Sequence, residues 1–499
     1  MKKNLISLSL TTVLVVSCFA ACGETKVSDE TVKTAETLSE GDVTAAEEDT
    51  PVLFTSSISY PDLEGETLKV YTSNHINGWT NNTIINHSDE EDGEVVNDAL
   101  FARDRFVEEK LNIKLEYTIE GTGNTGTQLS KLQKSITSGD DMADLIILDH
   151  AVICAGLAMK GMIYPLNHID TIDLSAGYWM PELNDRCRIG NSLYFASCAI
   201  SPRYYSSVYV TGINRDIAAD MGLEDVYEVV KSGRWTFDKM IEMAKKGARD
   251  LDGDTDVDTK DQIGLMYGSL EGYVLGAGMS FLENRDGKLY CMFDDSDLIN
   301  YMEHCIEGFQ EFGVFNEGRN DIDWDGVIRG GRCLFWNPCT SDLTELRDLE
   351  YDYGILPQPK RDEAQDGYIG FSQPWINVTP MIPVTVEKLS DAGVLTDAMA
   401  AYGYDYIRPA VFDNVIMLKG TRDDQSAQIV DLIFQNITFD LSIDIGLSSI
   451  NQIVSKSFAT QLGKQSVSSL WAAQKDKINS QIQSLMDSFA EHESDLGIK

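Results

Sequence analysis

The chain has 499 residues, with 40 Lys and Arg against 80 Asp and Glu, which gives a net charge of -40 and a pI near 4.3. A balance this acidic repels phosphate backbones, so nucleic acid is excluded as a natural partner. Hydrophobic residues make up 43% of the chain, which predicts a folded core rather than a fibrous or disordered protein. At roughly 150 residues per domain, the length predicts about three domains or two large lobes.

The N-terminus indicates export. Two lysines precede an apolar run over residues 5–16, and residues 1–21 together have the pattern of a secretory signal peptide. Cys22 lies where bacterial lipoprotein signals are cut and lipidated, and the segment resembles a lipobox in which Phe19 replaces the usual Leu. The alternative is an ordinary signal peptide cut nearby. We expect Cys22 to carry palmitate and a further acyl chain, because two chains give stable anchoring.

Residues 22–64 follow as a stretch rich in Thr, Ser, Ala, Glu and Asp, without hydrophobic periodicity. This composition is typical of a flexible acidic linker. No later segment approaches 18 consecutive apolar residues, so no second membrane span is expected. The predicted location is therefore the extracellular face of the cell membrane, held by lipid.

The body begins with alternating elements. Short β-rich runs occupy residues 68–71, 113–119 and 145–148, and helical apolar spacing occupies 96–107 and 129–136. This βαβαβ order predicts a parallel, doubly wound sheet, in which ligands bind beyond the carboxyl ends of the strands. In this chain those ends lead into residues 73–79, 120–126, and Asp149 with His150.

A second α/β region begins near residue 206. A strand is expected at 208–210 and a helix after Thr236, which is a suitable N-cap. Further strand-like runs occupy 333–336, 353–356 and 375–378, and residues 397–489 are mostly helical. The last helix carries apolar residues at helical spacing: Ile478, Ile482, Leu485 and Phe489.

The cysteines predict neither a metal site nor a disulfide framework. Seven of the nine lie beyond the N-terminal segment, and no CxxC or Cys/His metal spacing is present. Seven thiols cannot pair completely, so a disulfide framework is not expected.

The order of elements from about residue 67 resembles that of extracellular solute-binding proteins of ABC importers, of the maltose-binding-protein-like sugar type. The stretches that carry the resemblance are ADLIILD (143–149), GNSLYFA (190–196) with GINRD (212–216), RWT (234–236), GGRCLF (330–335) and YGILP (353–357). Residues 408–412, 419–423 and 429–434 look like a subgroup found among Gram-positive lipoproteins.

This resemblance implies a two-lobe periplasmic-binding-protein-like α/β fold with hinged, doubly wound sheets. Lobe 1 would comprise residues 65–197 and 331–383, and lobe 2 residues 198–330 and 384–499. A solute in the cleft would draw the lobes together by hinge closure. The implied partners are ABC permease subunits in the membrane, and the protein itself, expected as a monomer, would perform no chemistry.

A sugar cleft needs flat aromatic side chains for the C–H faces and polar side chains for the hydroxyl groups. The candidate ligand-binding residues are Trp79, Asp149, Tyr273, Trp336, Trp375 and Trp471. For each aromatic residue, the alternative role is core packing. For Asp149 it is capping the following helix, and both roles can coexist.

The acidic run DLDGDTDVDTKD at 250–261 resembles an EF-hand calcium loop. The candidate calcium ligands are Asp250, Asp252, Asp254, Asp256 and Asp261. Two departures weaken the match, because Thr255 replaces the Gly of the sharp turn and Asp261 replaces the bidentate Glu. The alternative is a solvated acidic loop, and a bound calcium ion would be structural.

Two other classes stay open. An extracellular glycoside hydrolase or polysaccharide lyase would also use an aromatic cleft, but the sequence has no GxSxG, HExxH or P-loop motif. His75, His87 and His150 have only generic spacing for a metal site. A surface adhesin, or a sensor for a non-sugar solute, could share the same fold.

Overall fold

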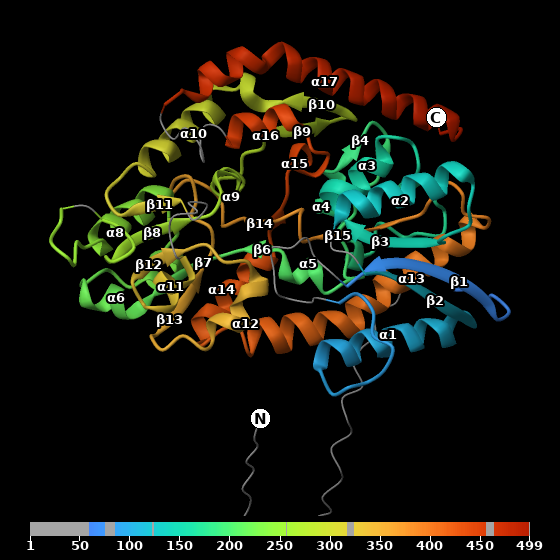
Figure 1. Cartoon of the computed structure of the whole chain (residues 1–499), viewed down its shortest axis with the longest axis horizontal. Helices are drawn as coiled ribbons and strands as arrows, with labels where there is room; N and C mark the ends of the chain where they lie inside the picture. The colour runs from blue at the N-terminus through green and yellow to red at the C-terminus, as the bar shows by residue number, and fades with distance from the viewer. Residues whose placement is uncertain are drawn as a thin grey trace, which may run out of the picture. The chain divides into compact units, whose positions relative to one another are not determined.

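The computed structural model of the chain (Figure 1) divides into two units, Met1–Thr50 and Pro51–Lys499. The structure describes residues 59–74, 85–121, 124–255, 257–316, 324–455 and 464–498, all within the second unit. The predicted signal peptide, Cys22 and most of the predicted linker lie outside the described residues, as do His75, Trp79 and Asp256.

The first sheet has the strand order β15-β3-β1-β2. Its strands are β1 (Glu66–Ser73), β2 (Ile113–Glu120), β3 (Leu145–Asp149) and β15 (Val378–Met381). Strand β1 pairs in parallel with β2 and β3, whereas β15 runs antiparallel to β3. Helices α1 (Val95–Leu111) and α2 (Thr125–Ser138) make the crossovers. The predicted βαβαβ unit is therefore confirmed, and its buried strand β3 has all five residues inside the core.

The second sheet has the order β11-β8-β12-β7-β13. Its strands are β7 (Thr211–Asn214), β8 (Ile263–Tyr267), β11 (Val314–Asn316), β12 (Cys333–Trp336) and β13 (Tyr353–Leu356). Strands β8, β11 and β12 are parallel to one another, and β7 runs antiparallel to β12 and β13. The two sheets occupy opposite sides of Figure 1.

Short sheets occupy the region between and above the two large ones. A three-stranded sheet joins β6 (Val208–Tyr209), β14 (Gly370–Ser372) and β16 (Ile437–Thr438). Two hairpins are formed by β4 (Arg188–Ile189) with β5 (Ser192–Leu193), and by β9 (Leu282–Arg285) with β10 (Lys288–Cys291). Because the three-stranded sheet draws strands from three distant parts of the chain, it ties together the segments that pass between the large sheets.

Helices cover both sheets and the region between them. The further α-helices are α3 (Ala155–Ala158), α4 (Pro181–Asp185), α5 (Arg203–Ser206), α6 (Arg215–Asp220), α7 (Val226–Lys231), α8 (Phe237–Gly247), α9 (Leu270–Gly276), α10 (Ser296–Gly308), α11 (Trp324–Arg329), α12 (Leu343–Leu346), α13 (Leu389–Arg408), α14 (Asp424–Phe434), α15 (Leu441–Asp444), α16 (Ser448–Ser455) and α17 (Val467–Asp495). Shorter 3-10 and π turns are η1 (His150–Cys154), η2 (Leu166–His168), η3 (Gly177–Trp179), η4 (Met292–Asp294), η5 (Thr340–Asp342) and η6 (Pro409–Met417).

Local signals account for many of the helix boundaries. Thr236 caps α8 by accepting a hydrogen bond from the backbone N–H of Lys239, as predicted. Asn112 ends α1 in the left-handed conformation and Gly139 ends α2 in the same way. The four apolar residues predicted for the last helix are all buried along α17.

Helix α17 reaches from one half of the body to the other, along the upper edge of Figure 1. Near its start, Trp471 Nε1 donates to Asp294 Oδ1 in η4 at 3.2 Å. Near its end, the Phe489 ring lies 5.1 Å from the Tyr194 ring. A single helix therefore contacts the segment beside the second sheet and the segment beside the first.

Two expectations about the lobes are wrong. Strand β12 was assigned to lobe 1, but it pairs with β7 and β8 in the second sheet, and β13 joins the same sheet. The chain therefore returns to the first sheet only after β13, through β14 and β15. The stretch after residue 383 was assigned to lobe 2, yet α13 packs against α1 beside the first sheet. A four-residue buried strand fits either sheet, so its pattern alone did not select the partner.

Two absences hold within the described ranges. The seven described cysteines are all free: Cys154, Cys187, Cys198, Cys291, Cys305, Cys333 and Cys339. In the same ranges, no helix combines the length and the apolar character that a bilayer crossing requires.

Candidate functional site

Two of the predicted ligand-binding residues meet at the carboxyl end of β3. Asp149 is the last residue of β3 and pairs with Val378, the first residue of the antiparallel strand β15. Trp375 comes three residues before Val378, so it lies just beyond the end of β3, and the backbone N–H of His150 donates to Asn377 O at 3.3 Å. Strand β15 begins later than the predicted run at 375–378, because Trp375 lies in a turn.

Trp375 differs from the other predicted aromatic residues in its exposure. Its side chain is 43% exposed, and it alone among the tryptophans of the described ranges is exposed rather than buried or half-buried. An exposed indole ring next to a polar strand end is available to a ligand, whereas a buried ring is already covered by protein.

The end of β1 carries a buried polar cluster. Asn86 Nδ2 donates to Thr72 Oγ1 at 3.0 Å and to Ser73 O at 3.1 Å, and Ser201 Oγ donates to Asn86 Oδ1. The Arg203 guanidinium, 3% exposed, donates to Ser73 O at 3.2 Å. Ser201 and Arg203 belong to the segment that leaves the first sheet for β6 and β7. The cluster therefore fixes this connecting segment against the strand end.

Asp149 caps η1 and places a carboxyl group at this edge of the sheet. Its Oδ1 accepts hydrogen bonds from the backbone N–H groups of Val152 at 2.8 Å and Ile153 at 3.2 Å. Burial raises the pKa of Asp149, while these hydrogen bonds and the charge of Arg203 act in the opposite direction. Burial also lowers the pKa of Arg203 to about 10, although the negative charge of Asp149 acts to raise it. The predicted capping role is thus present, and the ligand role stays a prediction.

Two segments connect the large sheets: one runs from the first sheet through Ser207 and Tyr209, and the other returns through Ser372 and Gln373. They are hydrogen-bonded to each other beside Trp375. The backbone N–H of Gln373 donates to Ser207 O at 2.7 Å, and Gln373 Nε2 donates to Tyr209 Oη at 2.8 Å. The hydroxyl groups of Ser207 and Ser372 lie 2.9 Å apart. These bonds hold the turn that carries Trp375 against the neighbouring connection.

The other predicted aromatic residues are packed. Trp336 in β12 is 2% exposed, and a Cβ at Gly212 would lie 2.4 Å from its ring, so the indole fills the space above a glycine. Tyr273 in α9 is 1% exposed, and its hydroxyl donates to Asn337 Oδ1 at 2.6 Å. Trp471, also buried, stacks on Phe293. Core packing, the alternative role, accounts for all three positions.

Two buried ionisable features were missed from the sequence, one beside the end of β3 and one in α9. His150 and Asp444 are buried together, with Nδ1 3.4 Å from Oδ1, and apart from this ion pair neither side chain has a hydrogen-bond partner among the described residues. Burial raises the pKa of Asp444, and His150 acts against the rise. Glu271 in α9 is half-buried, and desolvation raises its pKa. The His150–Asp444 pair carries no sequence signal, because the two residues lie far apart in the chain.

The acidic loop brings together only part of the predicted calcium set. Carboxylate oxygens of Asp250, Asp252 and Asp254 lie within 4.8 Å of one another. Asp261 stays outside this group, because its oxygens accept backbone N–H bonds from Leu251 and Asp258, both at 2.7 Å. Those bonds lower the pKa of Asp261. Whether calcium binds this loop stays a prediction.

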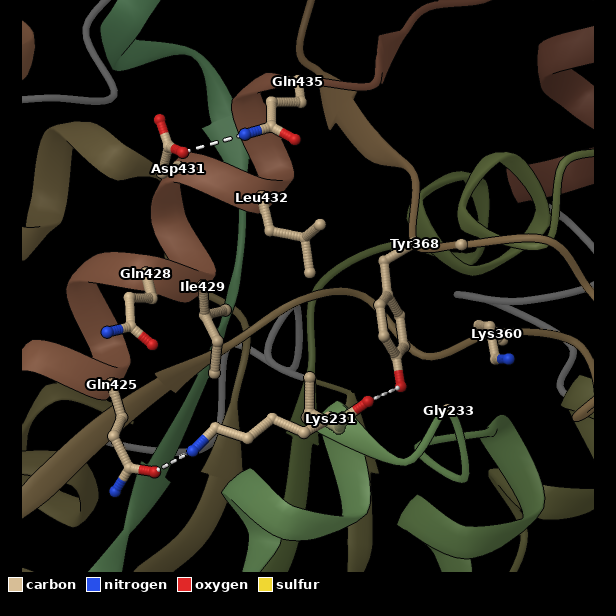
Figure 2. Close-up of a pocket in the computed structure, with 12 residues that line it drawn as sticks. Lys231, Gly233, Lys360, Tyr368, Gln425, Gln428, Ile429, Asp431, Leu432 and Gln435 are labelled. Carbon is tan, nitrogen blue, oxygen red and sulfur yellow. Dashed lines mark hydrogen bonds between the residues drawn. The ribbon is translucent and has the colours of Figure 1, made fainter.

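Three pockets flank the short three-stranded sheet. A groove of 460 Å³ lies between the end of α7, the loop before β14 and helix α14. In Figure 2, Lys231 Nζ donates a hydrogen bond to Gln425 Oε1, and the Tyr368 hydroxyl donates to Val230 O. The apolar side chains of Ile429 and Leu432 also line this groove. Gln435 also lines a second pocket of 300 Å³, and Arg186 lines both that pocket and a third of 350 Å³.

Comparison with known proteins bears on the whole arrangement. Residues 88–294 match the family model described as bacterial extracellular solute-binding protein. The resemblance predicted from the sequence is confirmed. The matched residues run from the segment before α1 to η4, so they include β2 and β3 of the first sheet and β7 and β8 of the second. No curated protein matches the sequence.

Solved structures show that the solute-binding fold extends over the body. The maltose/maltodextrin-binding domain MalE from Bdellovibrio bacteriovorus, bound to maltotriose, has 13% identity and a TM-score of 0.51, covering 84% of this chain and 100% of its own. A solute-binding protein from Thermotoga lettingae, bound to α-D-tagatose, has 15% identity and a TM-score of 0.50 over 84% and 100%. UgpB from Mycobacterium tuberculosis, in complex with glycerophosphocholine, has 13% identity and a TM-score of 0.52 over 84% and 98%. The predicted two-lobe α/β fold is confirmed, and the family model that matches residues 88–294 describes solute-binding proteins.

Proposed function

We propose that this chain is a lipid-anchored extracellular substrate-binding protein that delivers a carbohydrate, in particular an oligosaccharide, to an ABC importer. On this proposal, Cys22 carries the lipid on the outer face of a Gram-positive type of cell membrane. The body acts as a monomer, and the permease subunits take over the released solute.

The observation that carries the proposal is the exposed ring of Trp375 at the carboxyl end of β3. A pyranose ring offers an apolar C–H face that stacks on an indole, and a rim of hydroxyl groups that need charged or amide partners. Asp149 and Arg203 lie beside the same strand end, buried and ionisable. The family match and the sugar-bound relatives of similar fold support the same class of solute.

The connecting segments suggest how binding is signalled. Trp375 and Arg203 lie on the two connections between the sheets, which hydrogen bonds already join, so a solute at this point would bind where the two halves of the body meet. A solute can shift an equilibrium between open and closed forms only by binding one form more tightly. Permease subunits would then distinguish loaded from empty protein by the positions of the two halves.

The test is calorimetry and thermal unfolding with α-D-tagatose, mannobiose, maltotriose and glycerophosphocholine. At about one hundred times its dissociation constant, a ligand stabilises the folded state by roughly 2.7 kcal/mol. Trp375→Ala should weaken sugar binding at least tenfold at an unchanged unfolding temperature. Phe312→Ala is the matched control, because Phe312 is 50% exposed but lies away from the strand end.

The outcomes separate the alternatives. Sugar binding with intact recovery of the sugar supports the proposal, and cleavage of a glycan would replace it with an enzyme. Binding of glycerophosphocholine alone would keep the fold but change the solute class. For the anchor, incorporation of labelled palmitate should be lost in Cys22→Ala, and unchanged incorporation would contradict it.

A further inference from the structure

Arg186 lies between two pockets that are lined by distant parts of the chain. It follows α4, in the region that precedes the first connection between the sheets. The pocket of 350 Å³ on one side of Arg186 is lined by residues from α9 to β9 and from 438 to 441. The pocket of 300 Å³ on the other side is lined by Tyr204, by residues 434–437, and by Met180, Pro181, Leu183 and Arg186. A molecule that occupies both pockets therefore contacts both halves of the body and the connection through β16.

The lining has the two components that a sugar needs. The larger pocket combines apolar Leu275, Phe439 and Leu441 with polar Ser280, Asn284 and Thr438. The smaller pocket combines Tyr204 and Phe434 with the amides of Gln435 and Asn436. Amide side chains both donate and accept, so they suit hydroxyl groups better than they suit ions.

The Arg186 guanidinium has donors to spare. It is exposed, and Nη1 donates to Thr438 Oγ1 at 3.3 Å, which is its one hydrogen bond among the described residues. A guanidinium carries five N–H donors in a fixed plane. Because Arg186 lines both pockets, its remaining donors are available to the oxygens of a ligand that spans them.

The lining is electrically balanced. Among the described residues of the two pockets, Arg186 and Glu283 are the charged side chains, and Glu283 is already bound to Arg285 at 2.6 Å. The chain as a whole carries a charge of -40, which repels anionic ligands from its surface. A neutral solute fits this lining better than a sugar acid or sugar phosphate does.

These pockets are connected to the end of β3 by direct contacts. Tyr204 follows Arg203 in α5, and the Phe439 ring packs edge-on to His150 at 5.8 Å. The pockets therefore border the strand end that carries Asp149.

We propose that the two pockets are adjoining subsites for a neutral oligosaccharide of at least two rings, with one ring on each side of Arg186. This inference rests on the proposed function and specifies its solute. Each pocket has the volume to hold about one sugar ring, since ligand sites in proteins commonly span 300–1,000 Å³. Arg186 hydrogen-bonds to the link between the rings, so a monosaccharide forfeits one subsite.

The experiment compares Arg186→Ala, Arg186→Lys and Arg188→Ala by calorimetry against α-D-tagatose, mannobiose, maltotriose and a galacturonic acid disaccharide. Arg188 is the matched control, because its side chain is bound to Asp185 and lines neither pocket. Hydrogen bonds to a charged group contribute about 1.5–3 kcal/mol, so Arg186→Ala should weaken binding of the neutral oligosaccharide about tenfold or more. Arg186→Lys should fall between, because an ammonium lacks the planar fork.

The results discriminate between this proposal and the broader one. Oligosaccharide binding that depends on Arg186, exceeds monosaccharide binding and exceeds binding of the acidic disaccharide supports the subsites. Oligosaccharide binding that is lost in Trp375→Ala but unchanged in Arg186→Ala overturns the subsites and leaves the proposed function standing. Equal affinity for one ring and for two or three overturns them as well. Absence of binding by every neutral sugar overturns both proposals.

Discussion

Glu493, near the end of α17, accepts hydrogen bonds from Ser192 Oγ at 2.6 Å and from the backbone N–H of Asn191 at 3.0 Å. Asn191 and Ser192 belong to the β4–β5 hairpin, which also contacts the turn between β9 and β10: the backbone N–H of Gly190 donates to Gly287 O at 3.1 Å. A Cβ at Gly287 would lie 2.8 Å from Gly190 O, so this approach requires glycine. Chain segments from three regions therefore converge on one turn.

Glu493→Ala should weaken the attachment of α17 to the β4–β5 hairpin. The carboxylate satisfies a hydroxyl and an amide, and charged hydrogen bonds of this kind contribute about 1.5–3 kcal/mol. We expect a lower free energy of unfolding in urea and faster amide exchange at residues 190–193. Glu491→Ala is the control, because Glu491 is exposed on the same helix. Equal stability of the two variants would show that α17 is held by its apolar face alone.

Asp397→Ala should be among the most destabilising single changes in the body. The carboxylate of Asp397, 0% exposed in α13, accepts from the hydroxyl groups of Tyr60 and Tyr178 and from Trp179 Nε1, each at 2.9 Å. Alanine removes the acceptor that these three donors share, two of which are buried, and this loss costs about 3 kcal/mol or more. Asp397→Asn keeps one acceptor oxygen, so its loss in urea unfolding should be smaller. A loss below about 1 kcal/mol for alanine would contradict this account.

Asp440 should make stability depend on pH. Burial raises its pKa to about 6, although Ser442 and the backbone N–H groups of Phe281 and Leu282 act to lower it. Since the folded pKa exceeds the unfolded value, the folded state binds the proton more tightly, and this contribution is complete below about pH 4 and lost as the pH rises through about 6.

Asp440→Asn removes this titration. The stability deficit of Asp440→Asn relative to the wild type should therefore grow as the pH falls from 7 to 4, by at most about 3 kcal/mol. Denaturant unfolding at pH 7, 6, 5 and 4 measures the change, with Asp295→Asn as an exposed N-cap control. A deficit that is constant across these pH values would contradict the raised pKa.

The acidic loop offers a test that does not depend on the solute. Thr255 has a φ of 76°, in the left-handed region that a β-branched residue rarely adopts. Thr255→Gly should raise the free energy of unfolding by about 1 kcal/mol. On the calcium prediction, the same change should also increase the affinity of the loop for calcium. Calcium titration of the wild type should release or absorb heat, and Asp254→Ala should abolish it. A flat titration in the wild type would refute the calcium prediction.

Local patterns were sufficient for much of the fold. Strand β3 was predicted from four consecutive apolar residues at 145–148, and the structure extends it by one buried residue to Asp149; similar short runs located β12 and β13 at their observed bounds. Pairing was harder, because a four-residue strand contains too little information to choose between two sheets. The assignment of β12 failed for that reason.

The candidate site was predicted less completely. Residue type led to Trp375 and Trp336 equally, but Gly212 leaves a space that Trp336 fills, and that space exists only in the folded pairing of β7 with β12. Arg186 and the His150–Asp444 pair were not found, because their environment is assembled from segments more than 200 residues apart.

The buried thiols of the body have a practical use. Of the described cysteines, Cys291 is the only one that is not fully buried, and desolvation raises its pKa to about 11, which keeps it protonated and slow to react at neutral pH. Maleimide reagents should therefore leave the native cysteines of the body largely unmodified. Fluorophores or spin labels could then be attached at one introduced cysteine on each half. The distance between the labels would report opening and closing, and the native cysteines would not need to be replaced first.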